Sequence, residues 1–131
     1  MAIIQSGNTK SIDVGKVEDK FFLSNMGTGF AAQVISEYEN LSGREFTAYS
    51  IAGWKAFNNI DFNDKYQLRD QNGNILHQAS QVLVSNTNIM GYGVSVSPSA
   101  SLVDGLLDVI AFNAKNKADF IVQCKIGRAH V

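Results

Sequence analysis

The sequence predicts a mainly β fold of the α+β class, an antiparallel β-sandwich or barrel with two or three helices beside it. Its 131 residues are the length of one domain, and 45% of them are hydrophobic, which is enough for one core. Several short β-prone segments are separated by glycine-rich turns, and an Asn-Gly pair predicts a hairpin between two of them. This pattern excludes a doubly wound parallel sheet.

The first strand is expected over residues 20–25 (KFFLSN), where polar or charged positions flank Phe22. The glycines at 27 and 29 permit backbone angles that other residues resist, so the chain is expected to turn there. Residues 30–38 are expected to form a short helix, because apolar side chains recur at three- and four-residue spacing.

The strongest helical pattern covers residues 44–58. Ser42 is a suitable N-cap, and Glu45 three residues later completes a capping-box pattern. One face is expected to pack inward, and Ile51 and Trp54 would widen it. That face consists of Phe46, Tyr49, Gly53, Ala56 and Phe57.

From residue 61 to residue 86 the pattern changes to period two, which indicates strands. Asn72-Gly73 is the signal of a tight type I′ turn, in which both central residues have positive φ. The returning arm, residues 75–85, is expected to be one strand whose centre, Val82-Leu83-Val84, is buried.

The remaining segments continue the β pattern and end in a helix. A crossing rich in glycine and asparagine, residues 86–93, leads to an alternation at Val94 and Val96. A further strand is expected at 106–112, and residues 117–124 are expected to begin a helix.

The charge balance limits the classes of partner. The chain has 11 Lys and Arg against 12 Asp and Glu, a formal net charge of −1, which gives no signal for nucleic acid. No apolar run approaches the roughly 18 residues that a spanning helix needs. The single cysteine, Cys124, excludes an internal disulfide and fits a reducing compartment. We therefore expect a cytoplasmic protein without a nucleic-acid partner.

Few residues suggest catalysis, and none is assigned a catalytic role. His77 has no second histidine or cysteine beside it in the sequence and is expected at the surface or the rim. Cys124 falls on an apolar helical face and is expected to act as a small hydrophobic residue. The segment Met26-Gly27-Thr28-Gly29-Phe30 could cradle a phosphate at a helix N-terminus, but G-x-G alone is not specific, and a strand-to-helix corner is the favoured interpretation.

Asp104-Gly105 has two interpretations. Both residues are favoured in tight turns. Alternatively, the carboxylate could join backbone carbonyls around Mg²⁺ or Ca²⁺, although one carboxylate rarely holds such an ion unaided. Asp108 is expected on the exposed side of its strand and would be a poor second ligand.

An ordered set of motifs resembles a known family. The segment 25–30 (NMGTGF) follows the first strand, and the run 98–109 (PSASLVDGLLDV) comes later. Over residues 11–124 the chain resembles the C-terminal domain of the diacylglycerol kinase/sphingosine kinase-like lipid kinases, particularly the bacterial soluble branch. The later run, of the form P-x-A-x-L-x-D-G-L-L-D-V, is the more specific part.

The resemblance implies half of a two-domain enzyme that transfers the γ-phosphoryl group of ATP, with Mg²⁺, to a lipid hydroxyl. An N-terminal domain with a G-G-D-G-T motif would hold most of the nucleotide, and this β-sandwich would help receive the lipid. By position, Asp104 corresponds to the carboxylate of a structural metal site, with the backbone carbonyls of Ser101 and Leu106 as its companions. Pro98 and Ala100 would shape the approach to that loop. With these carbonyls included, the metal and the turn interpretations are equally supported.

The chain departs from the family at both ends. It contains no G-G-D-G-T, and the family's acidic general base has no counterpart before Val131. Residues 1–124 are therefore predicted to be the β-sandwich domain alone, without the nucleotide-binding domain. Residues 125–131 (KIGRAHV) do not resemble the family and match the translation of a common sequencing adapter, so they are expected to be a non-native tail.

The leading hypothesis is the C-terminal half of an ATP-dependent lipid kinase acting on a diacylglycerol-like hydroxyl. We expect it to be inactive alone, because phosphoryl transfer needs both halves of the cleft. Its expected partners are the missing nucleotide-binding domain, the lipid and, transiently, a membrane surface; no oligomeric state is predicted. The alternative is a stand-alone β-sandwich module that binds an apolar ligand without chemistry, and a third hypothesis is a non-functional gene fragment.

Overall fold

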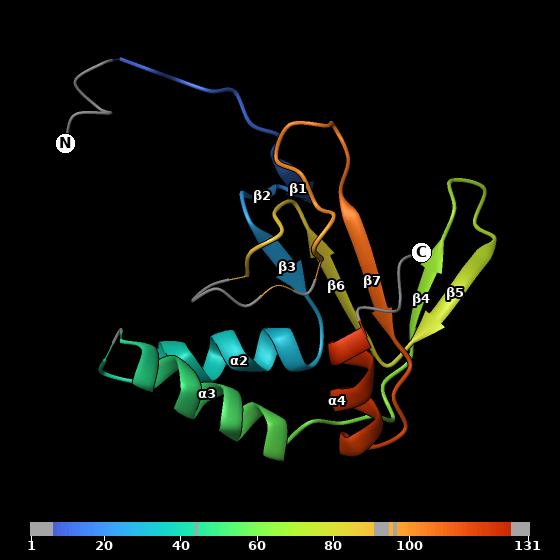
Figure 1. Ribbon diagram of the computed structural model, residues 1–131. Helices are drawn as coiled ribbons and strands as arrows, with labels where there is room; N and C mark the ends of the chain where they lie inside the picture. Colours follow the sequence, from blue (N-terminus) through green and yellow to red (C-terminus); the bar gives the residue numbers. More distant parts are fainter. Residues whose placement is uncertain (1–6, 44, 91–94, 96, 127–131) are drawn as a thin grey trace.

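The computed structural model describes residues 7–43, 45–90, 95 and 97–126, and it has the predicted α+β class with antiparallel sheets (Figure 1). The described part contains three helices, and none of them is both long and apolar enough to cross a membrane. The elements in chain order are β1 (Gly15–Val17), β2 (Lys20–Phe22), β3 (Asn25–Gly27), α2 (Phe30–Glu39), α3 (Phe46–Asn58), β4 (Tyr66–Arg69), β5 (Ile75–Ala79), β6 (Gln81–Ser85), β7 (Asp108–Phe112) and α4 (Lys117–Ile126).

The central sheet has the order β3-β6-β7, and both of its pairings are antiparallel. Two hairpins, β1-β2 and β4-β5, form separate two-stranded sheets. In Figure 1 the helices lie together at one end of the central sheet, and the β4-β5 ribbon projects to the side. All the described strand pairings are antiparallel, as the period-two patterns predicted.

The two faces of the central sheet carry different cores, because side chains alternate along a strand. On the helical face, Leu83, Ile110 and Phe112 pack with Phe120 of α4. On the opposite face, a smaller cluster of Ala79, Val82 and Ala111 packs against half-buried side chains of β4, namely Tyr66 and Leu68. Side chains of the β4-β5 ribbon therefore pack against one face of the central sheet, and side chains of the helices pack against the other.

The predicted strand at 20–25 is interrupted. Its first half is β2, which pairs with β1, and its last residue begins β3, which pairs with β6. The change of partner is supported by Asn86, whose side chain and backbone nitrogens donate hydrogen bonds to the carbonyls of Leu23 and Ser24 at 3.0 and 2.8 Å. The sequence showed the β propensity of this segment, but not that two sheets divide it.

The long arm predicted over 75–85 is divided in the same way. β5 pairs with β4, while β6 pairs with β3 and β7. The break is at Ser80, which is fully buried and whose backbone nitrogen and hydroxyl both donate to the carbonyl of Phe112, at 2.8 and 3.0 Å. The predicted burial of the segment is confirmed for Val82 and Leu83, and Val84 is half-buried.

The hairpin predicted at Asn72-Gly73 is confirmed, but the predicted type I′ turn is wrong. Of the two residues only Gly73 has positive φ, at 85°. The loop is longer than a two-residue turn, since the Asp70 carboxylate accepts hydrogen bonds from the backbone nitrogens of Asn72 and Asn74 at 2.9 and 2.8 Å. Hydrogen bonds from the Asn74 side chain and then its backbone hold the pKa of Asp70 below its ordinary value.

The helix predicted over 44–58 is α3, but its start and its buried face differ from prediction. It begins at Phe46 with Glu45 as N-cap and no side-chain capping bond, so the Ser42 capping box is wrong. The predicted face is confirmed for Ala56, which is buried, and for Tyr49, Gly53 and Phe57, which are half-buried. The other buried residues are two further alanines, whereas Phe46, Ile51 and Trp54 are exposed. α2 and α3 run side by side (Figure 1), and small side chains allow that approach. The alanines are Ala48, Ala52 and Ala56.

The other predicted helices are confirmed. α2 occupies the predicted segment and α4 begins at the predicted residue, Lys117. The strand predicted at 106–112 is β7, which begins two residues later at Asp108. The alternation at Val94 and Val96 lies outside the described residues.

Candidate functional site

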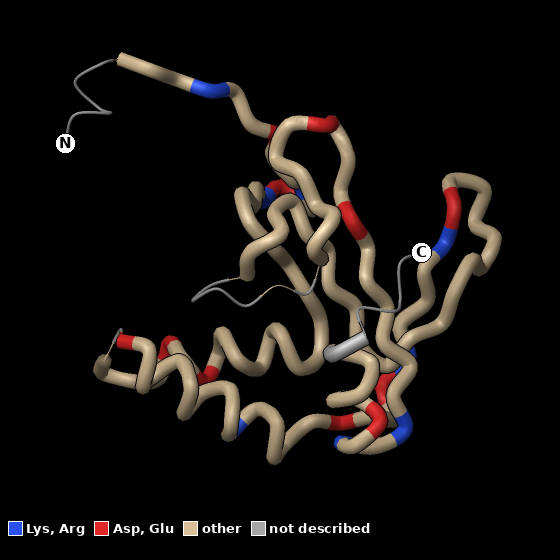
Figure 2. The backbone as a smooth tube through the Cα atoms, in the orientation of Figure 1, with Lys and Arg blue, Asp and Glu red and all other residues tan. Residues whose placement is uncertain are grey.

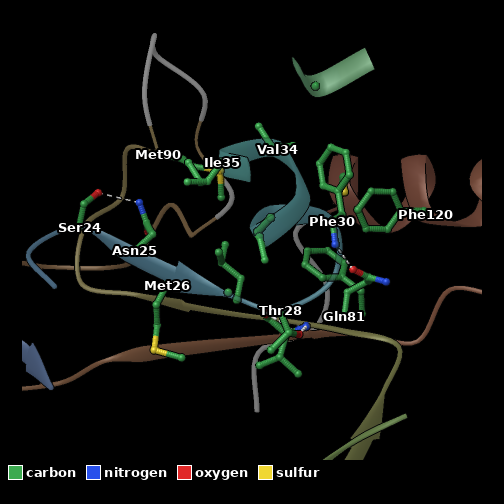
Figure 3. A pocket seen from close by; sticks show the side chains of 18 of the residues that line it. Ser24, Asn25, Met26, Thr28, Phe30, Val34, Ile35, Gln81, Met90 and Phe120 are labelled. Carbon is green, nitrogen blue, oxygen red and sulfur yellow. Dashed lines mark hydrogen bonds between the residues drawn. The ribbon is translucent and has the colours of Figure 1, made fainter. Parts of the chain in front are cut away.

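An apolar pocket of about 740 Å³ opens between the central sheet and the helices. Such a volume is within the range of small-molecule sites, which is roughly 300–1,000 Å³. Its lining comes from β3, β6, β7 and all three described helices (Figure 3). The lining residues are Ser24, Asn25, Met26, Gly27, Thr28, Phe30, Ala31, Ala32, Val34, Ile35, Tyr49, Gly53, Gln81, Val82, Leu83, Met90, Phe112, Phe120 and Cys124.

Among the residues that the structure describes, no charged side chain lines the pocket. The chain from β3 through most of α2, residues 25–36, contains no charged residue, and Figure 2 shows this stretch uncoloured between charged loops and helix ends. A site without charge does not offer an anionic group a partner, whereas it favours apolar ligands by the ordinary hydrophobic effect.

The wall of the pocket turns sharply where β3 runs into α2. Gly29 is the N-cap of α2, with φ 58° and ψ −122°, a conformation that favours glycine. Gly27 has an ordinary φ, so its backbone does not require glycine. An added Cβ, however, would lie only 2.8 Å from the Cβ of Ala31 and 3.1 Å from the carbonyl oxygen of Val82. One glycine therefore supplies the backbone angle and the other allows close packing.

The side chain of Gln81 caps the N-terminus of α2. The backbone nitrogen of Phe30 donates to Gln81 Oε1, and Gln81 Nε2 donates to the carbonyl of Asp61 at 2.9 Å. Thr28 adds a second link, since its hydroxyl accepts a hydrogen bond from the Val82 nitrogen at 3.0 Å. A phosphate at this helix end would have to displace the buried Gln81 amide. The strand-to-helix corner is therefore the correct interpretation of the G-x-G segment.

One end of the pocket is aromatic. The ring of Phe120 makes edge contacts with Phe30 and Phe112, at centroid distances of 5.3 and 5.5 Å, and a tilted contact with Phe62 at 6.2 Å. Cys124 lies one helical turn after Phe120 and also lines the pocket. Burial raises the pKa of the Cys124 thiol to about 11, so it stays neutral at physiological pH.

The other end is polar. Figure 3 shows Ser24 and Asn25 on the far side of the pocket from Phe30 and Phe120. The Asn25 side-chain nitrogen donates to the Ser24 hydroxyl oxygen at 2.7 Å. Ser24 is exposed and Asn25 is half-buried, so these polar groups lie where the pocket meets solvent. The pocket thus extends from an apolar, aromatic end to a polar end near the surface.

The loop that contains the predicted metal residues lies beside the β1-β2 hairpin (Figure 1), and none of residues 101–106 lines the pocket. Asp104 forms a tight turn, as its Oδ1 accepts a hydrogen bond from the Leu106 nitrogen at 3.0 Å, and Gly105 has φ 74°. The Ser101 hydroxyl accepts from the Val103 nitrogen at 3.3 Å. The turn interpretation is confirmed, and the metal interpretation stays a prediction.

Asp13 holds this loop in place. Its backbone nitrogen donates to the carbonyl of Leu102 and its Oδ2 accepts from the Gly105 nitrogen, both at 2.7 Å. Its carbonyl accepts from the Asn86 side chain at 2.8 Å. The segment before β1 is therefore tied to two loops that are distant in the sequence.

The other predicted residues take minor positions. His77 is half-buried on β5 and pairs in register with Leu68, as expected of a structural histidine at the rim. Asp108 is half-buried, which is less exposed than predicted, and its Oδ1 accepts from the Ser99 hydroxyl at 3.4 Å. Pro98 is exposed while Ala100 is buried.

Sequence reasoning missed the pocket and two residues that organise it or the nearby loops, Gln81 and Asp13. A single polar residue at the start of an apolar run, as in Gln81-Val82-Leu83-Val84, is the available signal, because a buried polar side chain needs partners. Nothing in the local sequence marks Asp13, whose partners lie between 73 and 92 residues away.

Comparison with known proteins supports the resemblance. The family model of the YegS C-terminal NAD kinase beta sandwich-like domain matches residues 24–126. The match includes the pocket residues and the 98–109 run. No curated protein and no solved structure gives a significant match to this chain.

Proposed function

Because this chain belongs to the family of the YegS C-terminal NAD kinase beta sandwich-like domain, we propose that it is the lipid-binding half of an ATP-dependent lipid kinase. In the whole enzyme, the lipid hydroxyl oxygen would attack the γ-phosphorus of ATP. The bond between that phosphorus and the bridging oxygen would break, ADP would leave, and the hydroxyl proton would pass to a general base elsewhere in the whole enzyme. A diacylglycerol-like alcohol is the proposed acceptor.

The observation that carries the proposal is the uncharged, largely apolar pocket between the sheet and the helices. An acyl chain would lie toward Phe120, where aromatic and aliphatic side chains exclude water. The hydroxyl-bearing end would then lie toward Ser24 and Asn25, near solvent. Held in this way, the lipid would present its hydroxyl at the edge of the domain, where a nucleotide-binding partner can reach it.

The chain's contribution to the reaction would be orientation and desolvation. Gln81 and Thr28 hold the corner between β3 and α2, so the pocket wall keeps its shape. The N-terminal nucleotide-binding domain would supply the ATP site and the groups that stabilise charge on the transferred phosphoryl. Neither half would suffice, because the reacting oxygen and phosphorus must be brought together.

The chemistry of the 101–106 loop fits the metal that the family implies. Asp104 and the carbonyls of Ser101 and Leu106 are hard oxygen donors of the kind that Mg²⁺ and Ca²⁺ prefer. Asp104 is exposed, and only its Oδ1 is used within the described residues, in the turn to Leu106. A divalent ion would supply a structural cross-link of the loop, and the lipid phosphorylation step does not pass through it.

We expect millimolar Ca²⁺ or Mg²⁺ to stabilise the chain by about 1–3 kcal/mol, as ion binding to the folded state does at 10–100 times the Kd. Asp104→Asn should abolish this effect, because the amide keeps an acceptor for the Leu106 nitrogen but loses the charge. The measurement is the thermal midpoint with added cation and with chelator. Asp19→Asn, at another exposed turn, is the control. An equal cation effect in wild type and Asp104→Asn, or no effect in wild type, would refute the metal site.

The chain alone is expected to transfer no radiolabelled phosphate from ATP to dioctanoylglycerol in detergent micelles. A nucleotide-binding domain with the G-G-D-G-T motif, taken from a lipid kinase of this family together with the segment that carries its general base, should phosphorylate the lipid when it is joined to the chain. The same domain without the chain is the control. Phosphorylation by the chain alone would contradict the assignment of the halves, and lipid binding without phosphorylation in the joined protein would favour a stand-alone module.

A further inference from the structure

Gly53 lies in the middle of α3 and lines the pocket. Tyr49, one helical turn earlier on the same stripe, lines it as well. Tyr49 and Gly53 are both half-buried, and partial burial raises the pKa of the Tyr49 phenol. Position 53 therefore belongs to the helical wall of the pocket.

Neither the backbone nor the packing requires a glycine at this position. Gly53 has an ordinary helical φ, because it is not among the residues with positive φ. Apart from the backbone of α3 itself, a Cβ built there meets no atom of the described residues within 4 Å, whereas at Gly27 it would crowd Ala31 and Val82. Glycine in a helix interior is less stable than alanine. Gly53 therefore lowers the stability of α3, and the observed result of having glycine there is that the pocket is larger at this point.

We propose that Gly53 is a specificity-determining residue that sets how much acyl chain the pocket accepts. The inference rests on the proposed function, since it takes the ligand to be a lipid. A side chain at 53 would occupy pocket volume without disturbing the surrounding core. Short lipids would still fit, and longer ones would be excluded. Alanine at 53 would make α3 more stable while it narrows the pocket slightly.

The test uses the full 131-residue chain and the fluorescence of dansyl-undecanoic acid, displaced by dihexanoylglycerol or dioctanoylglycerol. For Gly53→Leu we expect dioctanoylglycerol to bind about tenfold more weakly than in wild type, a change of about 1.4 kcal/mol. Dihexanoylglycerol should be affected less. Ser50→Leu is the matched control, because Ser50 is exposed on the same helix and does not line the pocket; it should bind both lipids as wild type does.

Gly53→Ala keeps the proposal testable if the leucine variant does not fold. Its thermal midpoint should rise by about 4 °C, and it should lose affinity for dioctanoylglycerol while it keeps affinity for dihexanoylglycerol. If both variants at position 53 bind both lipids as wild type does, the inference fails and the lipid-binding proposal stands. If wild type displaces no probe with either lipid, the lipid-binding proposal fails, and the inference fails with it.

Discussion

Replacing Phe120 with alanine is expected to lower the free energy of unfolding by about 3–5 kcal/mol, the usual cost of removing a buried phenylalanine side chain. Phe120 is 5% exposed and its ring contacts Phe30, Phe62 and Phe112. Those contacts join α4 to α2, to β7 and to the chain before β4. A domain of this size is stable by only about 5–15 kcal/mol, so a substantial unfolded fraction is expected.

The measurement is urea unfolding followed by circular dichroism. Ile121→Ala is the matched control, since Ile121 is the next residue of the same helix and is 42% exposed. Its loss should stay below about 1 kcal/mol. If the free energy of unfolding falls equally in the two variants, Phe120 does not hold α4 against the rest of the domain. Because Phe120 also lines the pocket, Phe120→Ala should weaken lipid binding even in the folded fraction.

Gly29→Ala is expected to cost about 2–4 kcal/mol, from backbone strain at positive φ and from loss of the hydrogen bond that caps α2. A Cβ at 29 would overlap the Gln81 side-chain amide, which accepts from the Phe30 nitrogen. The amide would have to move, and Asp61 would lose its hydrogen bond too. The midpoint of urea unfolding measures the effect.

Gly73→Ala separates the two contributions. Gly73 also has positive φ, at 85°, but a Cβ there meets no other atom within 4 Å. It should therefore cost only the backbone strain, about 1–2 kcal/mol. If Gly29→Ala is no more destabilising than Gly73→Ala, the Gln81 cap contributes nothing. If the cap matters, the double variant Gly29→Ala/Gln81→Ala should lose less than the sum of the two single variants, because both act on one contact.

Most elements of the fold could be predicted from local pattern. The helices at 30–39 and 117–126 follow from apolar spacing, and the hairpin follows from Asn72-Gly73, because each depends on residues close in the sequence. The turn type was predicted wrongly because the Asn-Gly pair was interpreted without Asp70, whose carboxylate accepts hydrogen bonds from the Asn72 and Asn74 nitrogens of the same loop. The interruptions of the strands at Leu23–Ser24 and at Ser80 could not be predicted, because distant strands compete for the same segment.

The buried face of α3 shows the limit most clearly. By size and hydrophobicity, Trp54 and Phe46 should lie inside, yet they are 67% and 57% exposed. The alanines at 48, 52 and 56 are buried instead. A helix packed closely against another favours small residues at the contact, and periodicity alone does not say which face meets the neighbour.

The amino-acid sequence by itself determined the α+β class, the positions of the helices, the main hairpin and, through the run around Asp104-Gly105, the family to which the chain belongs. Each of these depends on neighbours in the chain or on a contiguous motif. Only the tertiary structure decided the pocket, the role of Gln81 and the place of Gly53 in the pocket wall, because the lining residues come from β3, β6, β7 and the three described helices. Whether a glycine leaves empty space, or a glutamine closes a helix, depends on what folding brings opposite it.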